Sequence, residues 1–244
     1  MLQLAVAVKD SFIMSLYSKD ILARAIALPG FEDWSSPVDV PNLNRPPVRP
    51  HELPGQGRVA AVLLLLYPLS ETNFSGSGSQ LEGSLDLNLV LTKRNAGLSS
   101  HAGQISFPGG TREPTETLWQ TACRETFEEI GVGGGADAQS NQIELIGQLR
   151  PVYIPPSDFT VSPFVGWQDS APQFICAPEE VEAVIETSLS HLLQPRTLKM
   201  GEVVSASSKR INVPFYEVQG HRVWGATAIM LSELIERIRR VLVK

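Results

Sequence analysis

The chain has 244 residues, of which 43% are hydrophobic, so its size fits one domain or one domain with an appendage. Its net charge of −6 argues against a nucleic-acid-binding surface. The most apolar run, residues 60–69, is too short to cross a bilayer, which takes about 20 residues. The only two cysteines, Cys123 and Cys176, form no CxxC pair and fit a reducing compartment. We therefore expect a cytoplasmic protein that binds neither nucleic acid nor membrane.

The N-terminal part differs in composition from the rest of the chain. Residues 1–28 have the pattern of one amphipathic helix or two short ones, and seven prolines follow between Pro29 and Pro54. We predict that residues 1–55 form a helical and then proline-rich extension, and that residues 56–244 form the main domain. We also expect the first 50 residues or so to be dispensable for chemistry, because the proline-rich stretch separates them from every motif.

Strand and helix patterns alternate through the main domain. Residues 58–69 and 85–94 are predicted to pair as a hairpin with a long Gly/Ser-rich connection, and residues 104–107 read as a short strand. Further along, the sequence predicts a helix at 117–130, strands at 143–152, 159–167, 211–218 and 221–225, and a final helix at 226–244; residues 177–193 show mixed helix and strand patterns. Such a mixture predicts an α/β fold built as a sandwich around a mixed sheet.

The helix predicted at 117–130 carries an unusual concentration of negative charge. Thr117 and Gln120 match a capping box, and Gly131 stands where a left-handed C-terminal cap favours glycine. Glu125, Glu128 and Glu129 then share one face within an arc of about 100°.

Two interpretations of these glutamates are open. In the first interpretation they form a solvent-exposed helix face, as acidic residues on helices commonly do. Here, like charges three and four positions apart repel, and acids near a helix C-terminus oppose its dipole. A hard divalent cation would reverse both effects, so the spacing also indicates a metal site.

The residues around the glutamates closely resemble the Nudix box. Gly110 is followed after five residues by Glu116 and after seven more by a run from Arg124 to Val132, which reads RETFEEIGV. The one departure is Thr126, where the family usually has an apolar residue. Because Thr126 lies on the predicted packing face, this departure concerns packing and not chemistry.

A second segment resembles the coenzyme A diphosphatase branch of this family. Residues 91–110, LTKRNAGLSSHAGQISFPGG, match its pattern at Leu91, Thr92, Arg94 and Gly103 and at Phe107, Pro108, Gly109 and Gly110. Asn95 stands where the branch prefers a small residue, and Ser99 where it often has arginine. The similarity covers about residues 58–235.

The resemblance implies a Nudix-type α/β/α sandwich and a diphosphatase that uses Mg²⁺ or Mn²⁺. It implies that Glu125, Glu128 and Arg124 carry the catalysis. The metal ligands it implies are Glu125, Glu128, Glu129, Gly109 and Gly110, with Glu180 as the added carboxylate from the acidic patch at Glu179, Glu180 and Glu182. Lys93, Arg94 and Arg112 are the candidate phosphate contacts.

The expected substrate is a small nucleotide, first coenzyme A or its acyl derivatives. The resemblance leaves two other functions open. One is a Nudix pyrophosphatase for ADP-ribose, NADH or another nucleoside diphosphate derivative, and the other is a non-catalytic Nudix-fold binding module. A homodimer is a possible assembly of the chain.

Overall fold

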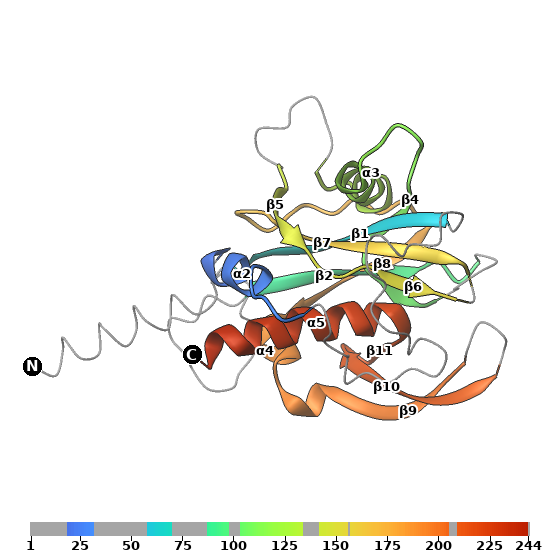
Figure 1. Cartoon of the computed structure of the whole chain (residues 1–244). Coiled ribbons are helices and arrows are strands. Elements are labelled where there is room, and N and C mark those ends of the chain that lie inside the picture. Colours follow the sequence, from blue (N-terminus) through green and yellow to red (C-terminus); the bar gives the residue numbers. More distant parts are fainter. Residues whose placement is uncertain are drawn as a thin grey trace, which may run out of the picture.

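The central strand, β1 (Arg58–Pro68), is buried on both faces. The computed structural model describes residues 19–31, 58–69, 87–97, 103–133, 142–155, 157–204 and 209–243 (Figure 1). Leu63 and Leu65 pack in one hydrophobic cluster, and Leu64 and Leu66 pack in the other, because successive side chains of a strand point to opposite faces. The apolar run at 60–69 is therefore a strand between two layers, as predicted.

The described strands form a mixed eight-stranded sheet around β1. β2 (Leu87–Arg94) and β4 (Gly109–Thr111) pair with β1 in antiparallel fashion, whereas β7 (Phe159–Trp167) runs parallel to it. The remaining strands extend the sheet on either side: β3 (Ile105–Ser106) and β8 (Val181–Ser188) next to β2, and β5 (Glu144–Gln148) and β6 (Val152–Ile154) next to β7. The predicted pairing of the first two strands is confirmed, while most of the predicted connection between them lies outside the described residues.

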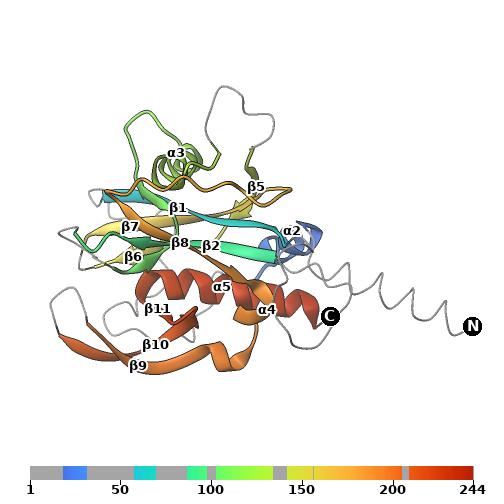
Figure 2. The ribbon, with the colours of Figure 1, turned by 180° about the vertical axis from the view of Figure 1, so that it is seen from behind.

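Helices cover both faces of this sheet. Figures 1 and 2 show α3 (Leu118–Ile130) on one face and α5 (Gly225–Leu242) on the other. A second, three-stranded sheet, made of β9 (Leu198–Val204), β10 (Arg210–Val218) and β11 (His221–Val223), lies on the far side of α5. The predicted α/β/α sandwich with a mixed sheet is confirmed.

Four elements differ from the sequence prediction. The strand predicted at 143–152 is two strands, β5 and β6. Residues 177–193 resolve into β8 and a short helix, α4 (Leu189–Leu192), which a 3₁₀ turn, η2 (Pro195–Thr197), follows. β4 and β9 were not predicted, because glycines interrupt the side-chain alternation on which a strand prediction rests.

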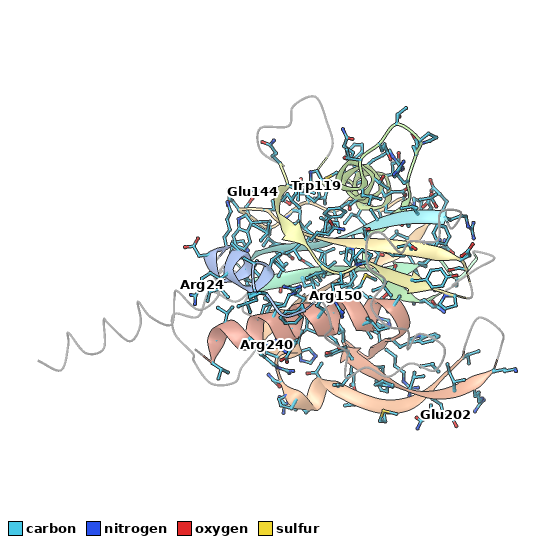
Figure 3. All side chains as sticks on the ribbon, viewed as in Figure 1. Arg24, Trp119, Glu144, Arg150, Glu202 and Arg240 are labelled. Carbon is cyan, nitrogen blue, oxygen red and sulfur yellow. The ribbon has the colours of Figure 1, made fainter. Side chains whose placement is uncertain are left out.

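The described part of the N-terminal segment packs on the main domain. Helix α2 (Lys19–Ile26) buries Ile21, Leu22 and Ala25 in the same hydrophobic cluster as residues of α5. Its Lys19 pairs with Glu144, a residue at the start of β5 that is labelled in Figure 3. Helical structure is thus confirmed for residues 19–26, while the proline-rich stretch at 32–57 lies outside the described residues. None of the helices in the described ranges is both long and apolar enough to span a membrane.

Candidate active site

Both ends of α3 are fixed by hydrogen bonds. At the N-terminus, Thr117 Oγ1 accepts from Gln120 N at 3.3 Å, and Thr117 N donates to Gln120 Oε1 at 2.9 Å, which confirms the predicted capping box. At the C-terminus, Gly131 is left-handed with a φ of 73°, as predicted. The carbonyls of Glu129 and Ile130 each accept a backbone N–H from residues 175–177 at 2.9 Å. The helix therefore presents its glutamates from a fixed position.

Arg124 is the centre of the charge network on α3. Its Nε donates to Glu116 Oε1 at 2.6 Å, and its Nη1 lies 2.9 Å from Glu125 Oε1 and 2.8 Å from Glu128 Oε2. Its Nη2 also donates to the carbonyl of Thr111 on β4 at 3.1 Å. The spacing of the glutamates predicts that a metal ion supplies the positive charge beside them. The structure shows that Arg124 supplies part of this positive charge.

Glu116 joins the loop before α3 to this network. The hydrogen bond from Arg124 lowers the pKa of Glu116 to about 2, with a smaller contribution from the Thr121 hydroxyl, which donates to Glu116 Oε2 at 2.9 Å. Glu116 therefore stays ionised and binds Arg124 at Nε, while Glu128 binds the same guanidinium at Nη1.

Glu129 and Glu125 are buried to different degrees. Glu129 is only 4% exposed, and its Oε2 accepts from Gly109 N at 3.2 Å. Burial raises the pKa of Glu129 to about 7, although the bond from Gly109 and the nearby charge of Arg94 lower it. Burial likewise raises the pKa of Glu125, and the negative charge of Glu180 adds to the rise for both groups.

Glu180 lies on the turn before β8, and this turn starts at Ala177, whose N–H donates to the carbonyl of Glu129 at 2.9 Å. The side chain of Glu128 is 53% exposed, and it shares Arg124 Nη1 with Glu125. The four carboxylates differ in their access to solvent, and so they are suited to different roles.

Two glycines allow β4 to pass close to its neighbours. A Cβ at Gly110 would lie 2.5 Å from the carboxylate carbon of Glu125. Gly109 has a φ of 148°, and a Cβ there would overlap the carbonyl oxygen of Ala61 on β1. The backbone of Gly110 therefore lies directly against a candidate ligand, which a side chain would displace.

The three candidate basic residues are placed differently. Arg94 Nη1 lies 3.9 Å from Glu129 Oε1, and within the described structure the buried Arg94 Nε has no hydrogen-bond partner. Lys93, its neighbour on β2, pairs instead with Glu182 at 2.6 Å. Arg112 is exposed just after β4. The structure brings Arg94 to the glutamates and directs the charge of Lys93 to another carboxylate.

Over the described ranges, no three His, Cys, Asp or Glu side chains converge closely enough to hold a metal ion. The donor types nevertheless fit a hard divalent cation, because the Glu125 carboxylate lies against the Gly110 backbone and Mg²⁺ prefers oxygen ligands. Two hydrogen bonds near this site were not predicted from the sequence. Arg124 donates to the Thr111 carbonyl, and Asn95 donates to the Pro178 carbonyl. Both end on backbone oxygens, for which residue identity gives no pattern.

The chain is similar to known proteins of one family. A model of the NUDIX domain matches residues 82–206. An uncharacterised Nudix hydrolase, NudL of Photorhabdus laumondii, is 32% identical over 152 residues, which are 62% of this chain and 77% of that protein. Nudix hydrolase 3 of Caenorhabditis elegans is 32% identical over 168 residues, 61% of this chain and 65% of its own. The human mitochondrial coenzyme A diphosphatase NUDT8 is 34% identical over 145 residues, 58% of this chain and 59% of its own.

Proposed function

Because the chain belongs to the Nudix hydrolase family, we propose that it is a metal-dependent diphosphatase of coenzyme A or acyl-coenzyme A. Water would be added across the diphosphate to give 3′,5′-ADP and 4′-phosphopantetheine or its acyl form. One observation carries the proposal. The segment that resembles the coenzyme A branch meets the Nudix box at Glu129, where Arg94 lies 3.9 Å from the carboxylate and Gly109 N donates to it at 3.2 Å. The likeness to a human protein named as a coenzyme A diphosphatase supports the same substrate.

The carboxylates divide the work in this proposal. Mg²⁺ or Mn²⁺, when bound, supplies charge neutralisation of the diphosphate and a more acidic water. Glu125, Glu128, Glu129 and Glu180 are the proposed ligands, together with a backbone oxygen at Gly109 or Gly110.

Proton transfer is assigned to the two carboxylates that contact Arg124 Nη1, Glu128 and Glu125. Glu128 is 53% exposed and so can be reached by water, and we place it first as the acceptor of the water proton, with Glu125 as the alternative. Arg124 holds both side chains through contacts of 2.8 and 2.9 Å, so its role is to orient them.

Arg94 is the preferred phosphate contact among the basic residues. Its guanidinium has one long contact, to Glu129 at 3.9 Å, and no described partner for Nε, so turning toward a phosphate would disrupt little. Arg112 is exposed and can approach the same substrate. Lys93 is a weaker candidate, because its ammonium already pairs with Glu182.

Cys123 and Cys176 are both free thiols, which supports the proposed cytoplasmic location.

A product assay tests the substrate. The protein is incubated with coenzyme A, ADP-ribose or NADH, each with Mg²⁺ or Mn²⁺, and the products are identified by mass. We expect 3′,5′-ADP and 4′-phosphopantetheine from coenzyme A. Hydrolysis of ADP-ribose with coenzyme A untouched would overturn the substrate assignment and direct attention to Ser99. A folded protein that cleaves none of the three would overturn the proposed activity on this panel.

Glu128→Gln tests the role of the exposed carboxylate. The substitution keeps the shape of the side chain and removes its charge, so we expect turnover to fall by about 100-fold or more. Without metal, relief of repulsion by Glu125 and loss of the Arg124 pair nearly cancel, so stability should change little. Glu113→Gln, an exposed acid on the loop before α3, is the matched control and should keep full activity. Full activity of Glu128→Gln together with an unchanged metal-induced rise in melting temperature would contradict the assignment.

A further inference from the structure

Glu180 lies on an exposed turn, outside any helix or strand. The turn is closed by two backbone bonds to the carbonyl of Ala177, from Glu180 N at 3.0 Å and from Val181 N at 2.9 Å. On one side, Ala177 N donates to the carbonyl of Glu129 at 2.9 Å, so the turn begins at the C-terminus of α3. A ligand on an exposed turn needs further support if its carboxylate is to stay in one place.

The second support of the turn comes from Asn95, at the end of β2. Asn95 N donates to the carbonyl of Glu180 at 2.8 Å, a bond that every residue except proline could make. Its side chain adds a bond that depends on the amide, because Nδ2 donates to the carbonyl of Pro178 at 2.6 Å. The amide oxygen accepts from Gly97 N at 2.8 Å, so both ends of the amide are fixed.

This amide is not part of the pattern that the surrounding segment resembles. The coenzyme A diphosphatase branch prefers a small residue at this position, and a small side chain has no amide to reach the Pro178 carbonyl. The Asn95 side-chain bond lies between two candidate site residues: Arg94 precedes Asn95 on β2, and Glu180 lies in the turn that Asn95 binds.

We propose that Asn95 is a positioning residue, which ties the turn at 177–180 to the end of β2 and so fixes Glu180 relative to the C-terminus of α3, where it would bind a divalent cation together with Glu125 and Glu129. The inference rests on the proposed metal-dependent function. Asn95 itself contacts neither metal nor substrate. Its effect on metal binding passes through Glu180, and that dependence can be measured.

The test measures binding of Mn²⁺ alone, by titration calorimetry without substrate. Partners that orient a metal ligand typically change affinity by about 10- to 100-fold, so we expect Asn95→Ala to weaken Mn²⁺ binding about tenfold. Asn95→Ser can still accept from Gly97 N but is too short to reach Pro178, and it should weaken binding to a similar extent. Asn88→Ala removes an amide bond to the Tyr67 hydroxyl at the other end of β2 and should leave binding unchanged.

Combination with Glu180→Gln distinguishes positioning from a general structural effect. If Asn95 acts through Glu180, then Asn95→Ala should cause no further loss of Mn²⁺ affinity once Glu180 is replaced. Equal losses in both backgrounds, or unchanged binding by Asn95→Ala and Asn95→Ser, would overturn the inference. Thermal unfolding of each variant with chelator verifies that it is folded.

The same data separate this inference from the proposed function. Mn²⁺ binding by the wild type that does not respond to Glu180→Gln would overturn the roles of Asn95 and Glu180 in metal binding and leave the proposed diphosphatase activity standing. A wild type that binds no Mn²⁺ and hydrolyses no substrate would overturn both.

Discussion

Glu129 is the site carboxylate whose ionised form is most strongly disfavoured by burial. It is 4% exposed, and burial raises its pKa from 4.5 to about 7. The folded protein therefore holds a proton that the unfolded chain releases in this range. Stability from this group is present below about pH 4.5 and is lost as the pH rises through about 7. A divalent cation at this carboxylate would displace the proton and remove the penalty.

We expect Glu129→Gln to remove this pH dependence in chelator, because glutamine does not titrate. At pH 5 the variant and the wild type should have similar free energies of unfolding. At pH 8 the variant should be more stable, by a difference on the order of 3 kcal/mol at most. Urea denaturation at both values measures the difference. Glu128→Gln, which removes a carboxylate that is 53% exposed, is the control. A gap that stays constant with pH would contradict the burial argument.

At the scale of elements, α3 depends on how its C-terminus meets the segment at 175–177. Gly131 ends the helix in a left-handed conformation with a φ of 73°, and a Cβ there would lie 2.9 Å from the Cβ of Ile175. Two effects thus favour glycine, the backbone conformation and the contact with Ile175. The same segment leads into the turn that carries Glu180, so helix termination and ligand placement are linked.

Gly131→Ala should lower the free energy of unfolding by about 2 kcal/mol or more, because it adds both strain and overlap. Gly220→Ala separates the two effects. Gly220 has a similar φ of 79°, but no atom lies within 4 Å of the position of its Cβ. We expect about 1 kcal/mol of loss there, from backbone strain alone. Equal losses at the two positions, measured by urea denaturation, would show that the Ile175 contact is unimportant.

Comparison of elements shows what the sequence could predict. The start and end of α3 were predictable, because Thr117, Gln120 and Gly131 act within a few residues of the helix ends. β4 was not, since it is defined by pairing with β1 some fifty positions earlier and its glycines carry no alternation. Arg124 could be expected to reach Glu128 one turn away, whereas its bond to the Thr111 carbonyl required the folded loop.

At the scale of the whole molecule, the sequence placed a domain boundary near residue 55 because the composition changes there. In the described structure, α2 packs into the hydrophobic core of the main domain. Arg237 on α5 donates to the carbonyls of Ile26 and Leu28 at 3.0 and 3.1 Å, and its guanidinium lies 4.0 Å from the ring centre of Phe31. Because these partners are more than 200 residues apart, local composition could not reveal the contact.

A buried charge network on α5 holds Arg237, the residue that binds the end of α2. Glu233, 2% exposed, receives Arg237 Nη2 at 2.9 Å and Arg150 Nε at 3.3 Å, and Figure 3 shows Arg150 beside α5. The network orients Arg237 toward the carbonyl of Ile26, the last residue of α2, and toward the carbonyl of Leu28 just beyond the helix. Loss of α2 would leave Arg237 half satisfied in the interior, which is costly for a buried charge.

We therefore predict that a chain beginning at Pro54 is less stable than one beginning at Lys19 but equally active when folded. Burial of Ile21 and Leu22 contributes about 2 kcal/mol each, so the shorter chain should lose about 4 kcal/mol or more. The glutamates lie on α3, across the sheet from α5, so the turnover number per folded molecule should stay the same. Urea denaturation and the coenzyme A assay at low temperature measure the two quantities. Leu22→Ala in the full chain, expected to cost 2–4 kcal/mol or thereabouts, tests the same packing without truncation. Equal stability of the two chains would mean that α2 contributes nothing to the core, and a folded but inactive short chain would mean that the N-terminal segment helps to build the site.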